Sequence, residues 1–341
     1  MSTKTNAIAK STTGAPPLGV SADLTGKTVV VVGANTGIGL AAAKLFATMK
    51  ASKVVLACRT QEKGKKAVAE VEETTGTKSA ELWLVDLAKF SSVVDFADRW
   101  EKKATWEETE GWESTLHVNH LSTVLCALLL LPRLLKTASQ FSAHTRLVIV
   151  SSGAHRATVN EYLRNSPNIL KALNDKEKGH LTSRVGPAPM QDLRCNISKL
   201  LNIFFTRSLV ARLGSTSPVI VSAISPVYCT FEQRIHPRVR DLIEVPILVE
   251  QDGKLVPLPE RTSEEGAYQL LWAALGPPNP DEIDSIRGAY VYDNQIVSPG
   301  EFVLGEDGKE SQERIWDETI DGLSGPAPQI KEIVNQYLHY K

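Results

Sequence analysis

A run of four valines at positions 29–32 leads directly into the glycine-rich segment Gly-Ala-Asn-Thr-Gly-Ile-Gly at positions 33–39. Consecutive β-branched residues of this kind predict a strand that is buried on both faces, as in a parallel sheet. Apolar residues then recur at positions 42, 45, 46 and 49, which is the spacing of one buried helix face. The glycines therefore connect a buried strand to a helix N-terminus, and such a turn suits the phosphates of a dinucleotide.

The pattern of a short apolar run followed by a helical segment repeats along the chain. The runs that predict strands cover residues 28–32, 53–57, 81–85, 146–150, 218–224 and 289–293. Alternating strands and helices are typical of an α/β fold in which a doubly wound, Rossmann-type parallel sheet carries helices on both faces. We expect residues 1–23 to form a mobile tail and residues 24–341 to form a single dinucleotide-binding domain.

The amino-acid composition limits the kinds of molecule that the protein is expected to bind. Hydrophobic residues make up 42% of the 341 residues and charged residues 23%, which is ordinary for a globular protein. A net charge of −1 and the lack of a basic stripe argue against nucleic acid, so we expect a small-molecule substrate. The four cysteines form no Cys-x-x-Cys pair, which argues against a metal site or a disulfide framework. This cysteine usage favours a reducing, cytoplasmic location.

The glycine spacing G-x-x-x-G-x-G resembles the cofactor loop of the short-chain dehydrogenase/reductase family, and the resemblance runs from about residue 24 to residue 323. It is of the retinol-dehydrogenase-like and fungal type. It implies that the loop residues contact a nicotinamide dinucleotide, and these are Gly33, Asn35, Gly37, Ile38 and Gly39. The implied reaction is hydride transfer between that cofactor and an alcohol or carbonyl compound.

Two residues at strand ends bear on the choice of cofactor. Arg59 follows the second predicted strand, where a carboxylate would bind the ribose 2′-hydroxyl of NAD. An arginine can pair with the 2′-phosphate of NADP, so the sequence predicts NADP(H), the alternative being a solvated loop arginine. Asp86 ends the third predicted strand and resembles the family's adenine-side carboxylate, although an aspartate there can also serve a turn.

One strand of the family pattern is missing. Residues 91–103 and 109–131 both predict helices, whereas right-handed βαβ winding requires a strand between them. The resemblance implies a central fourth strand at this point, ending in an Asn-Asn-Ala-Gly turn. Without it, either the sheet pairs differently or buried backbone groups stay unpaired at ~1–3 kcal/mol each. A third explanation is that the translated sequence lacks a segment at the junction of Lys103 and Ala104.

Four residues resemble the family's catalytic positions. Asn119 resembles the asparagine of the proton relay, and Ser152 resembles the serine that binds the substrate oxygen, with Ser151 as the possible misassignment. In place of the family's Tyr-x-x-x-Lys, the chain has Cys195 four residues before Lys199. A cysteine sulfur reaches less far than a phenol oxygen, and proton transfer needs contact of about 2.6–3.2 Å or a bridging water. The sequence therefore leaves three hypotheses: an atypical enzyme, a nucleotide-binding protein without turnover, and the product of a decayed gene that does not fold stably.

Other positions also depart from the family pattern. Val227 replaces a glycine and Phe231 replaces a hydroxyl residue, which affects the expected placement of the nicotinamide. Tyr162 lies in a long insertion and is expected on the surface, while His120 is expected to pack rather than to react. The insertion is similar to those of family members with lipophilic substrates.

Residues 121–135 form the longest apolar stretch, which is interrupted by Pro132 and Arg133. The stretch is shorter than the ~20 residues that a membrane span requires, so we expect a buried helix and no span. Family members commonly pair through helices in this region. The segment is therefore either core or the face of a homo-oligomer.

Overall fold

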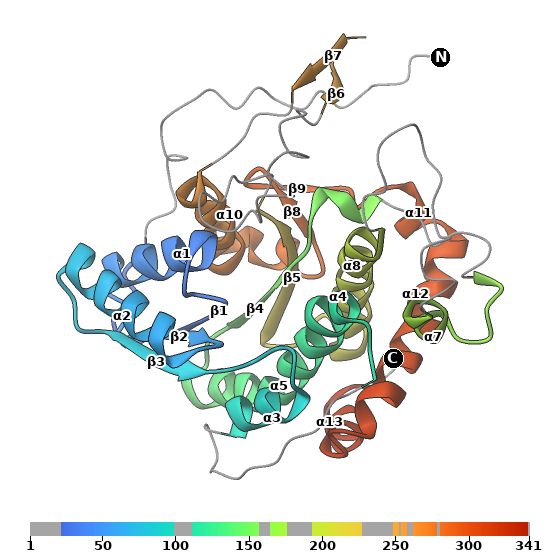
Figure 1. The fold of residues 1–341 in the computed structure, drawn as a ribbon, viewed down its shortest axis with the longest axis horizontal. Coiled ribbons are helices and arrows are strands. Elements are labelled where there is room, and N and C mark those ends of the chain that lie inside the picture. The colour runs from blue at the N-terminus through green and yellow to red at the C-terminus, as the bar shows by residue number, and fades with distance from the viewer. Residues whose placement is uncertain are drawn as a thin grey trace.

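The computed structural model describes residues 22–98, 111–156, 164–175, 193–226, 248–251, 254–257, 262–277 and 280–339. In this part of the chain, parallel strands lie between layers of helices (Figure 1). The predicted α/β class is therefore confirmed. The tail predicted for residues 1–23 falls almost wholly outside the described residues and stays a prediction.

The N-terminal sheet has three parallel strands with β2 in the middle. In the order β1-β2-β3, they are Thr28–Val32, Lys53–Cys58 and Ala80–Leu84. The connecting helices α1 and α2 are Gly37–Thr48 and Gln61–Thr75. Alanines and Phe46 on α1 form one core cluster with Val54 and Leu56 of β2, and Ala267 and Leu271 of the later helix at residues 263–275 join this cluster.

The second sheet is larger and also mostly parallel. In the order β4-β5-β8-β9, its strands are Thr145–Val150, Val219–Ser225, Tyr290–Tyr292 and Gln295–Val297. Only β9 is antiparallel, and it turns back through Asp293 and Asn294, whose positive φ angles are typical of a tight hairpin turn. A separate antiparallel hairpin joins β6 and β7, which are Leu248–Gln251 and Lys254–Pro257.

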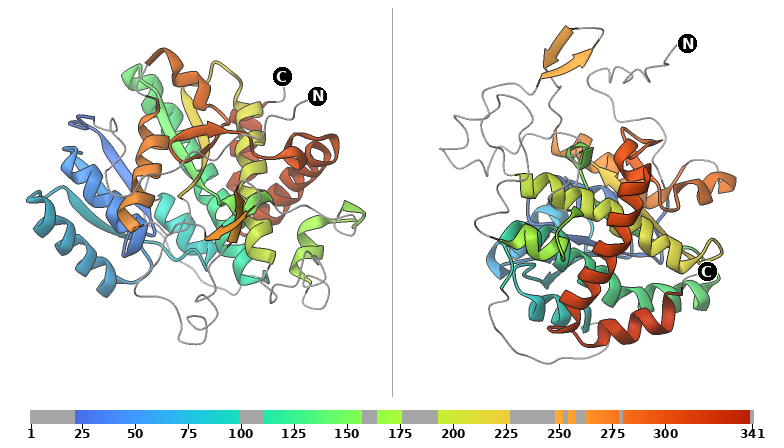
Figure 2. Two further views of the ribbon diagram at one scale, coloured as in Figure 1. Left: turned by 90° about the horizontal axis from the view of Figure 1, so that it is seen from above. Right: turned by 90° about the vertical axis from the view of Figure 1, so that its right-hand side faces the viewer.

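Helices cover both faces of the second sheet (Figure 2). The helices that precede β5 in the chain are α3 Phe90–Asp98, α4 Ser114–Leu116, η1 His117–Leu121, α5 Ser122–Phe141, η2 Gly153–Arg156, α7 Ile169–Asn174 and α8 Leu193–Leu213. Those after β7 are α10 Ser263–Leu275, η3 Pro280–Ile286, α11 Glu301–Leu304, α12 Glu306–Ser324 and α13 Gln329–Tyr337. Helices α5, α8 and α10 make the contacts with the sheet. The largest core cluster joins α5, α8 and α12 to β4 and β5.

The six predicted strand runs agree with β1, β2, β3, β4, β5 and β8 to within one or two residues at each end. The helix predicted for residues 109–131 begins later, at Ser114, and continues to Phe141. Short strand β9 and the C-terminal helices α12 and α13 were not predicted as separate elements. A three-residue strand is too short to show a periodic pattern, whereas α12 and α13 do carry an apolar face, with Ile315, Ile320 and Ile330 buried.

The sheet is divided where the fourth strand was predicted to be missing. Within the described residues, no strand lies between β3 and β4, β1 pairs only with β2, and β4 pairs only with β5. Val32 of β1 and Val150 of β4 are each 40% exposed, whereas every residue of β5 is buried. The sheet has therefore not paired differently in the described part. Val32 and Val150 are the last residues of β1 and β4, so solvent reaches the carboxyl ends of these two strands, and water can bond to backbone groups there.

Helix α10 is the element that spans the divided sheet. It packs against α1 of the N-terminal half and against β4 and β5 of the second sheet. A capping box begins it, because Thr262 Oγ1 accepts the N–H of Glu265 at 3.1 Å and the Glu265 carboxylate accepts the N–H of Thr262 at 2.8 Å. This helix links the two half-sheets across the missing strand.

The helix from His117 to Phe141 was predicted as a buried helix from its apolar residues. It is long and apolar enough to cross a membrane by length and composition, and half of its most apolar window is buried inside the protein. Leu121, Leu125 and Leu128 are fully buried in the main core. A core helix passes the same length and composition test, and the burial agrees with that reading.

Candidate active site

The glycine-rich loop has the backbone geometry that its sequence requires. Gly33 and Gly37 have φ angles of +82° and +57°, which disfavour any residue with a Cβ atom. A Cβ atom on Gly39 would lie 2.5 Å from the carbonyl oxygen of Gly33, so only glycine fits there. These three glycines allow the turn to fold back closely against the start of α1.

The N-terminus of α1 has no negative group of its own within its first turn. Thr36 is the N-cap residue, and its side chain makes no capping hydrogen bond. The first backbone N–H groups of the helix, among them those of Ile38 and Gly39, lie at the positive end of the helix dipole and are not capped by the Thr36 side chain. Asn35 stands just before them in the loop. This arrangement fits the pyrophosphate of a dinucleotide.

Arg59 lies at the end of β2, next to the glycine loop. The loop is joined to this strand because the N–H of Gly33 donates to the carbonyl oxygen of Ala57 at 2.9 Å. Arg59 is exposed and, among the residues that the structure describes, makes no ion pair. Asp86 does serve a turn, since its Oδ1 accepts the N–H of Ala88 at 3.0 Å. Its adenine-side role therefore stays a prediction.

Helix α8 brings the predicted catalytic segments together. It carries Cys195 and Lys199 one helical turn apart, and the hydroxyl of the intervening Ser198 accepts from Asn119 Nδ2 at 3.1 Å. The carbonyl oxygen of Lys199 in turn accepts the Ser151 hydroxyl at 2.7 Å. The segments that contain the predicted asparagine, serine and lysine thus meet at the carboxyl end of β4, where α/β folds place their ligands.

The two adjacent serines have different tasks. Ser151 is 2% exposed, its hydroxyl is bonded to the backbone of α8, and its N–H donates to the carbonyl oxygen of Ile224 at 2.6 Å. Ser152 is half-buried and stands just before the short helix η2, and its carbonyl oxygen accepts from the N–H of His155 at 3.1 Å. Ser151 is therefore a structural residue, and Ser152 is the better candidate for contact with a substrate.

Asn119 lies in a π-helical turn, His117–Leu121, at the start of α5. Such turns are often found at functional sites because they displace backbone carbonyls from the regular helix ladder. Asn202 Nδ2 donates to the displaced carbonyl oxygen of Asn119 at 3.0 Å. Asn202 was missed in the sequence, and nothing in its spacing would have identified it.

His120 packs in the core, as predicted, and also makes two hydrogen bonds. Its Nδ1 lies 3.1 Å from Asn202 Oδ1 and its Nε2 lies 3.2 Å from Thr319 Oγ1. The side chain is 1% exposed. Burial lowers the pKa of His120 to about 4, because the charged imidazolium would lose its hydration there.

Acid is expected to destabilise the protein through His120. The folded protein keeps this imidazole neutral down to pH about 4, whereas the unfolded chain protonates it below its usual pKa of 6.5. Neutral His120 therefore makes its full contribution to the free energy of unfolding above pH 6.5. This contribution, on the order of 3 kcal/mol, is lost as the pH falls toward 4. Urea unfolding between pH 7.5 and pH 4.5 measures it. His120→Gln should flatten the pH dependence, whereas the exposed control His144→Gln should leave it unchanged; equal slopes in all three proteins would contradict the assignment.

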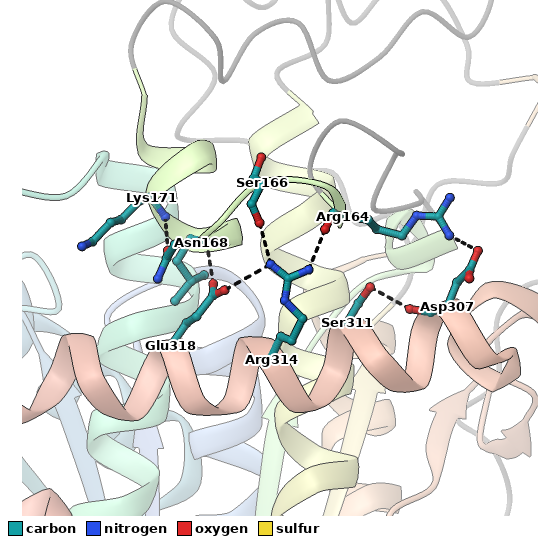
Figure 3. Close-up of polar contacts among 9 residues, drawn as sticks. Arg164, Ser166, Asn168, Lys171, Asp307, Ser311, Arg314 and Glu318 are labelled. Carbon is teal, nitrogen blue, oxygen red and sulfur yellow. Dashed lines mark hydrogen bonds and ion pairs between the residues drawn. The ribbon is translucent and has the colours of Figure 1, made fainter.

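Helix α12 holds the described part of the insertion that follows β4 (Figure 3). The Arg314 guanidinium donates to the carbonyl oxygens of Arg164 and Ser166 at 2.5 and 2.6 Å. Glu318, one turn further along α12, accepts the N–H of Leu170 at 2.9 Å. These contacts fix the chain just before α7 and the first turn of α7 against the C-terminal helix.

Several predicted positions lie outside the described residues. They are Tyr162, Val227 and Phe231, together with the junction at residues 103 and 104. Cys195 lies on α8, but its side chain is also outside the described part. The predictions made for these side chains are therefore unchanged.

The parallel half-sheets, the glycine loop and the Asn119–Lys199 cluster define a dinucleotide-binding protein of the oxidoreductase type. A family model described as short chain dehydrogenase matches residues 27–106. The chain is 27% identical to the short-chain dehydrogenase/reductase ffsI of Aspergillus flavipes, across 94% of this chain and 93% of that protein. It is 30% identical to the short-chain dehydrogenase/reductase phmF of Phaeosphaeria nodorum, across 91% and 90%. The chain belongs to the short-chain dehydrogenase/reductase family.

Solved structures agree on the fold. A short-chain dehydrogenase from Escherichia coli CFT073, complexed with NADPH, superposes with a TM-score of 0.51 at 18% identity, covering 81% of this chain and 98% of that one. An NADPH-bound short-chain oxidoreductase from Pseudomonas aeruginosa PAO1, described as containing an atypical catalytic center, gives 0.50 at 16% identity, covering 79% and 96%. At these identities the likeness is one of fold alone.

The aligned relatives contain residues that this chain lacks. The alignment with the Phaeosphaeria protein has 334 positions but takes in 91% of the 341 residues, which is about 310, so about 24 positions have no residue of this chain opposite them. In the alignment with the Aspergillus protein, about 19 of the 339 positions likewise have no residue of this chain opposite them.

Proposed function

We propose that the protein binds NADP(H) and transfers a hydride between it and a small or lipophilic alcohol or carbonyl compound, with an atypical proton-transfer step. The observation that carries this proposal is the glycine loop. Gly39 lies so close to the Gly33 carbonyl that a Cβ atom would clash, and the α1 N-terminus behind it has no capping side chain. Arg59 at the adjoining strand end supports the choice of the phosphorylated cofactor.

The residues present fit the cofactor and suggest a division of labour. The N-terminus of α1 would bind the pyrophosphate, Arg59 the 2′-phosphate and Lys199 the nicotinamide ribose. Bound NADP(H) supplies or accepts the hydride. Ser152 would donate a hydrogen bond to the substrate oxygen, and Asn119 would hold a water through which a proton reaches that oxygen. Cys195 would take part only through such a water, since its side chain is short.

The second candidate is a nucleotide-binding protein without turnover. It is supported by Cys195, which stands where the family has its tyrosine. A general acid at that position contributes about 10²–10⁴-fold to the rate of proton transfer. The open inner edges of the half-sheets add to it, because both end beside the site. Binding of NADPH with no oxidation of it by any carbonyl compound would favour this candidate.

Calorimetric titration with NADPH and NADH tests the proposed cofactor. NADPH should bind at least tenfold more tightly than NADH, because only NADPH offers a phosphate to Arg59. Arg59→Asp should remove that preference, since it replaces the cation by a group that favours the 2′-hydroxyl. The control Lys331→Asp makes the same charge change on exposed α13 and should keep the preference. Equal affinities of the natural protein for both nucleotides would contradict the assignment.

We also propose a cytoplasmic protein that forms homo-oligomers through α5. Cys58 and Cys126 are free buried thiols, and burial raises their pKa values to about 11 and about 12. Reduced thiols of this kind support a reducing compartment. Much of α5 is already core, so its remaining apolar side chains, among them the 66% exposed Phe141, would form the contact. Sedimentation equilibrium of the purified chain tests the oligomer.

A further inference from the structure

Asn202 occupies a central place among the segments of the proposed site. It lies on α8 three residues after Lys199 and is 1% exposed. Its amide nitrogen donates to two backbone carbonyl oxygens, that of Asn119 at 3.0 Å and that of Val150 at 3.1 Å. One side chain therefore ties α8 to the π-helical turn and to the last residue of β4, just before Ser152.

The orientation of this amide is fixed by its partners. Both contacts of Asn202 Nδ2 are carbonyl oxygens, which only accept hydrogen bonds. The amide nitrogen, and not Oδ1, must therefore face them. Asn202 Oδ1 then accepts from His120 Nδ1, which assigns the proton of the neutral imidazole to Nδ1. His120 Nε2 is left to accept from the hydroxyl of Thr319 on α12. Every donor in this buried chain has an acceptor.

We propose that Asn202 is a positioning residue for the nicotinamide half of the cofactor, holding the Asn119 and Val150 carbonyls in register with Lys199. The inference rests on the proposed NADP(H) function. Two features make the position sensitive. The π-helical turn departs from the α-helical hydrogen-bond pattern at Asn119. In the described part of the chain, β4 pairs on one side only, where Val150 lies opposite Ile224 of β5, so each segment has fewer regular hydrogen bonds here than an α-helix or a central strand. Asn202 supplies hydrogen bonds to both.

The role makes a specific claim about the two halves of the cofactor. The adenosine half would bind at α1 and Arg59, which belong to the other half-sheet, whereas the side-chain partners of Asn202 in the described part of the chain are Asn119, His120 and Val150. Loss of the Asn202 amide should therefore weaken a ligand that carries the nicotinamide riboside. It should spare adenosine 2′,5′-bisphosphate, which ends before that group. A residue needed only for folding would affect both ligands alike.

The test is calorimetric titration of the full chain with NADPH and with adenosine 2′,5′-bisphosphate. Asn202→Ala should lower the affinity for NADPH about tenfold, the effect of one or two lost hydrogen bonds. Its affinity for the bisphosphate should change less than about twofold. Asn202→Asp keeps the volume but removes both donated hydrogen bonds, so it is measured as well and replaces the alanine variant if that does not fold.

The matched control is Ser208→Ala, a buried polar residue on the same helix whose hydroxyl contacts Glu313 and no part of the proposed site. It should change neither affinity. An equal loss of affinity for both ligands in the Asn202 variants, or no loss of affinity for either, would overturn the positioning role. If the natural chain binds neither ligand, the proposed function fails first and the inference falls with it.

Discussion

Gly39→Ala is expected to lower the affinity for NADPH by on the order of 100-fold, which is about 2.7 kcal/mol. The added methyl group would lie 2.5 Å from the carbonyl oxygen of Gly33 and 3.0 Å from its carbonyl carbon. Both atoms are backbone, so the loop must move outward as a whole. Its N–H groups would then leave the positions in which they can bind a pyrophosphate.

The affinity is measured by calorimetric titration, and thermal unfolding is followed in the same samples. Gly325→Ala is the control, since this glycine has an ordinary φ of −69° and a Cβ atom there would meet nothing within 4 Å. It should bind NADPH as the natural protein does. Unchanged binding by Gly39→Ala would show that this loop does not hold the nucleotide.

Cys195→Tyr is expected to raise the turnover of NADPH with a lipophilic ketone by about 10²-fold or more, the usual contribution of a well-placed general acid. Position 195 lies on α8 one turn before Lys199, so a tyrosine there shares a helix face with the lysine. The phenol carries its hydroxyl several ångströms further out than a thiol and can donate the proton directly.

Cys195→Phe separates the hydroxyl from the ring. It adds nearly the same volume without a proton to donate, so it should gain no activity. Turnover is followed as loss of NADPH absorbance over a series of ketones and aldehydes. If the tyrosine and phenylalanine variants behave alike, the proton supply at position 195 does not limit the reaction.

The divided sheet gives a physical account of what the missing strand costs. If the inner edges were dry, each unpaired backbone group would cost ~1–3 kcal/mol. The 40% exposure of Val32 and Val150 shows that water reaches the carboxyl ends of β1 and β4, which lowers that cost there but also leaves two strands without a neighbour.

The N-terminal half could be predicted almost completely from sequence. Valine runs, glycine spacing and helix periodicity are local signals, so β1, α1 and β2 follow from neighbouring residues alone. The absence of a strand between the helices after β3 was also a local signal, since one helical pattern followed another. The choice between Ser151 and Ser152 needed the structure, because the hydrogen bond from the Ser151 hydroxyl to the Lys199 carbonyl oxygen distinguishes them.

The support of the site could not be predicted in the same way. Asn202, His120 and Thr319 are separated by up to 199 positions and meet only through tertiary packing. A buried asparagine or histidine carries no periodic signal that separates it from an ordinary polar residue of a helix. The contacts of α12 with α7 likewise depend on backbone carbonyls, which sequence does not distinguish.

The central claim is that a sheet open between β1 and β4 still carries a working nucleotide site. Amide hydrogen exchange, measured by mass spectrometry with and without NADPH, tests both parts at once. The account predicts that β1 and β4 exchange faster than β2 and β5, and that NADPH slows exchange at residues 33–40. Slow exchange of β1 and β4, equal to that of β2 and β5, or no protection of the loop by NADPH, would contradict it.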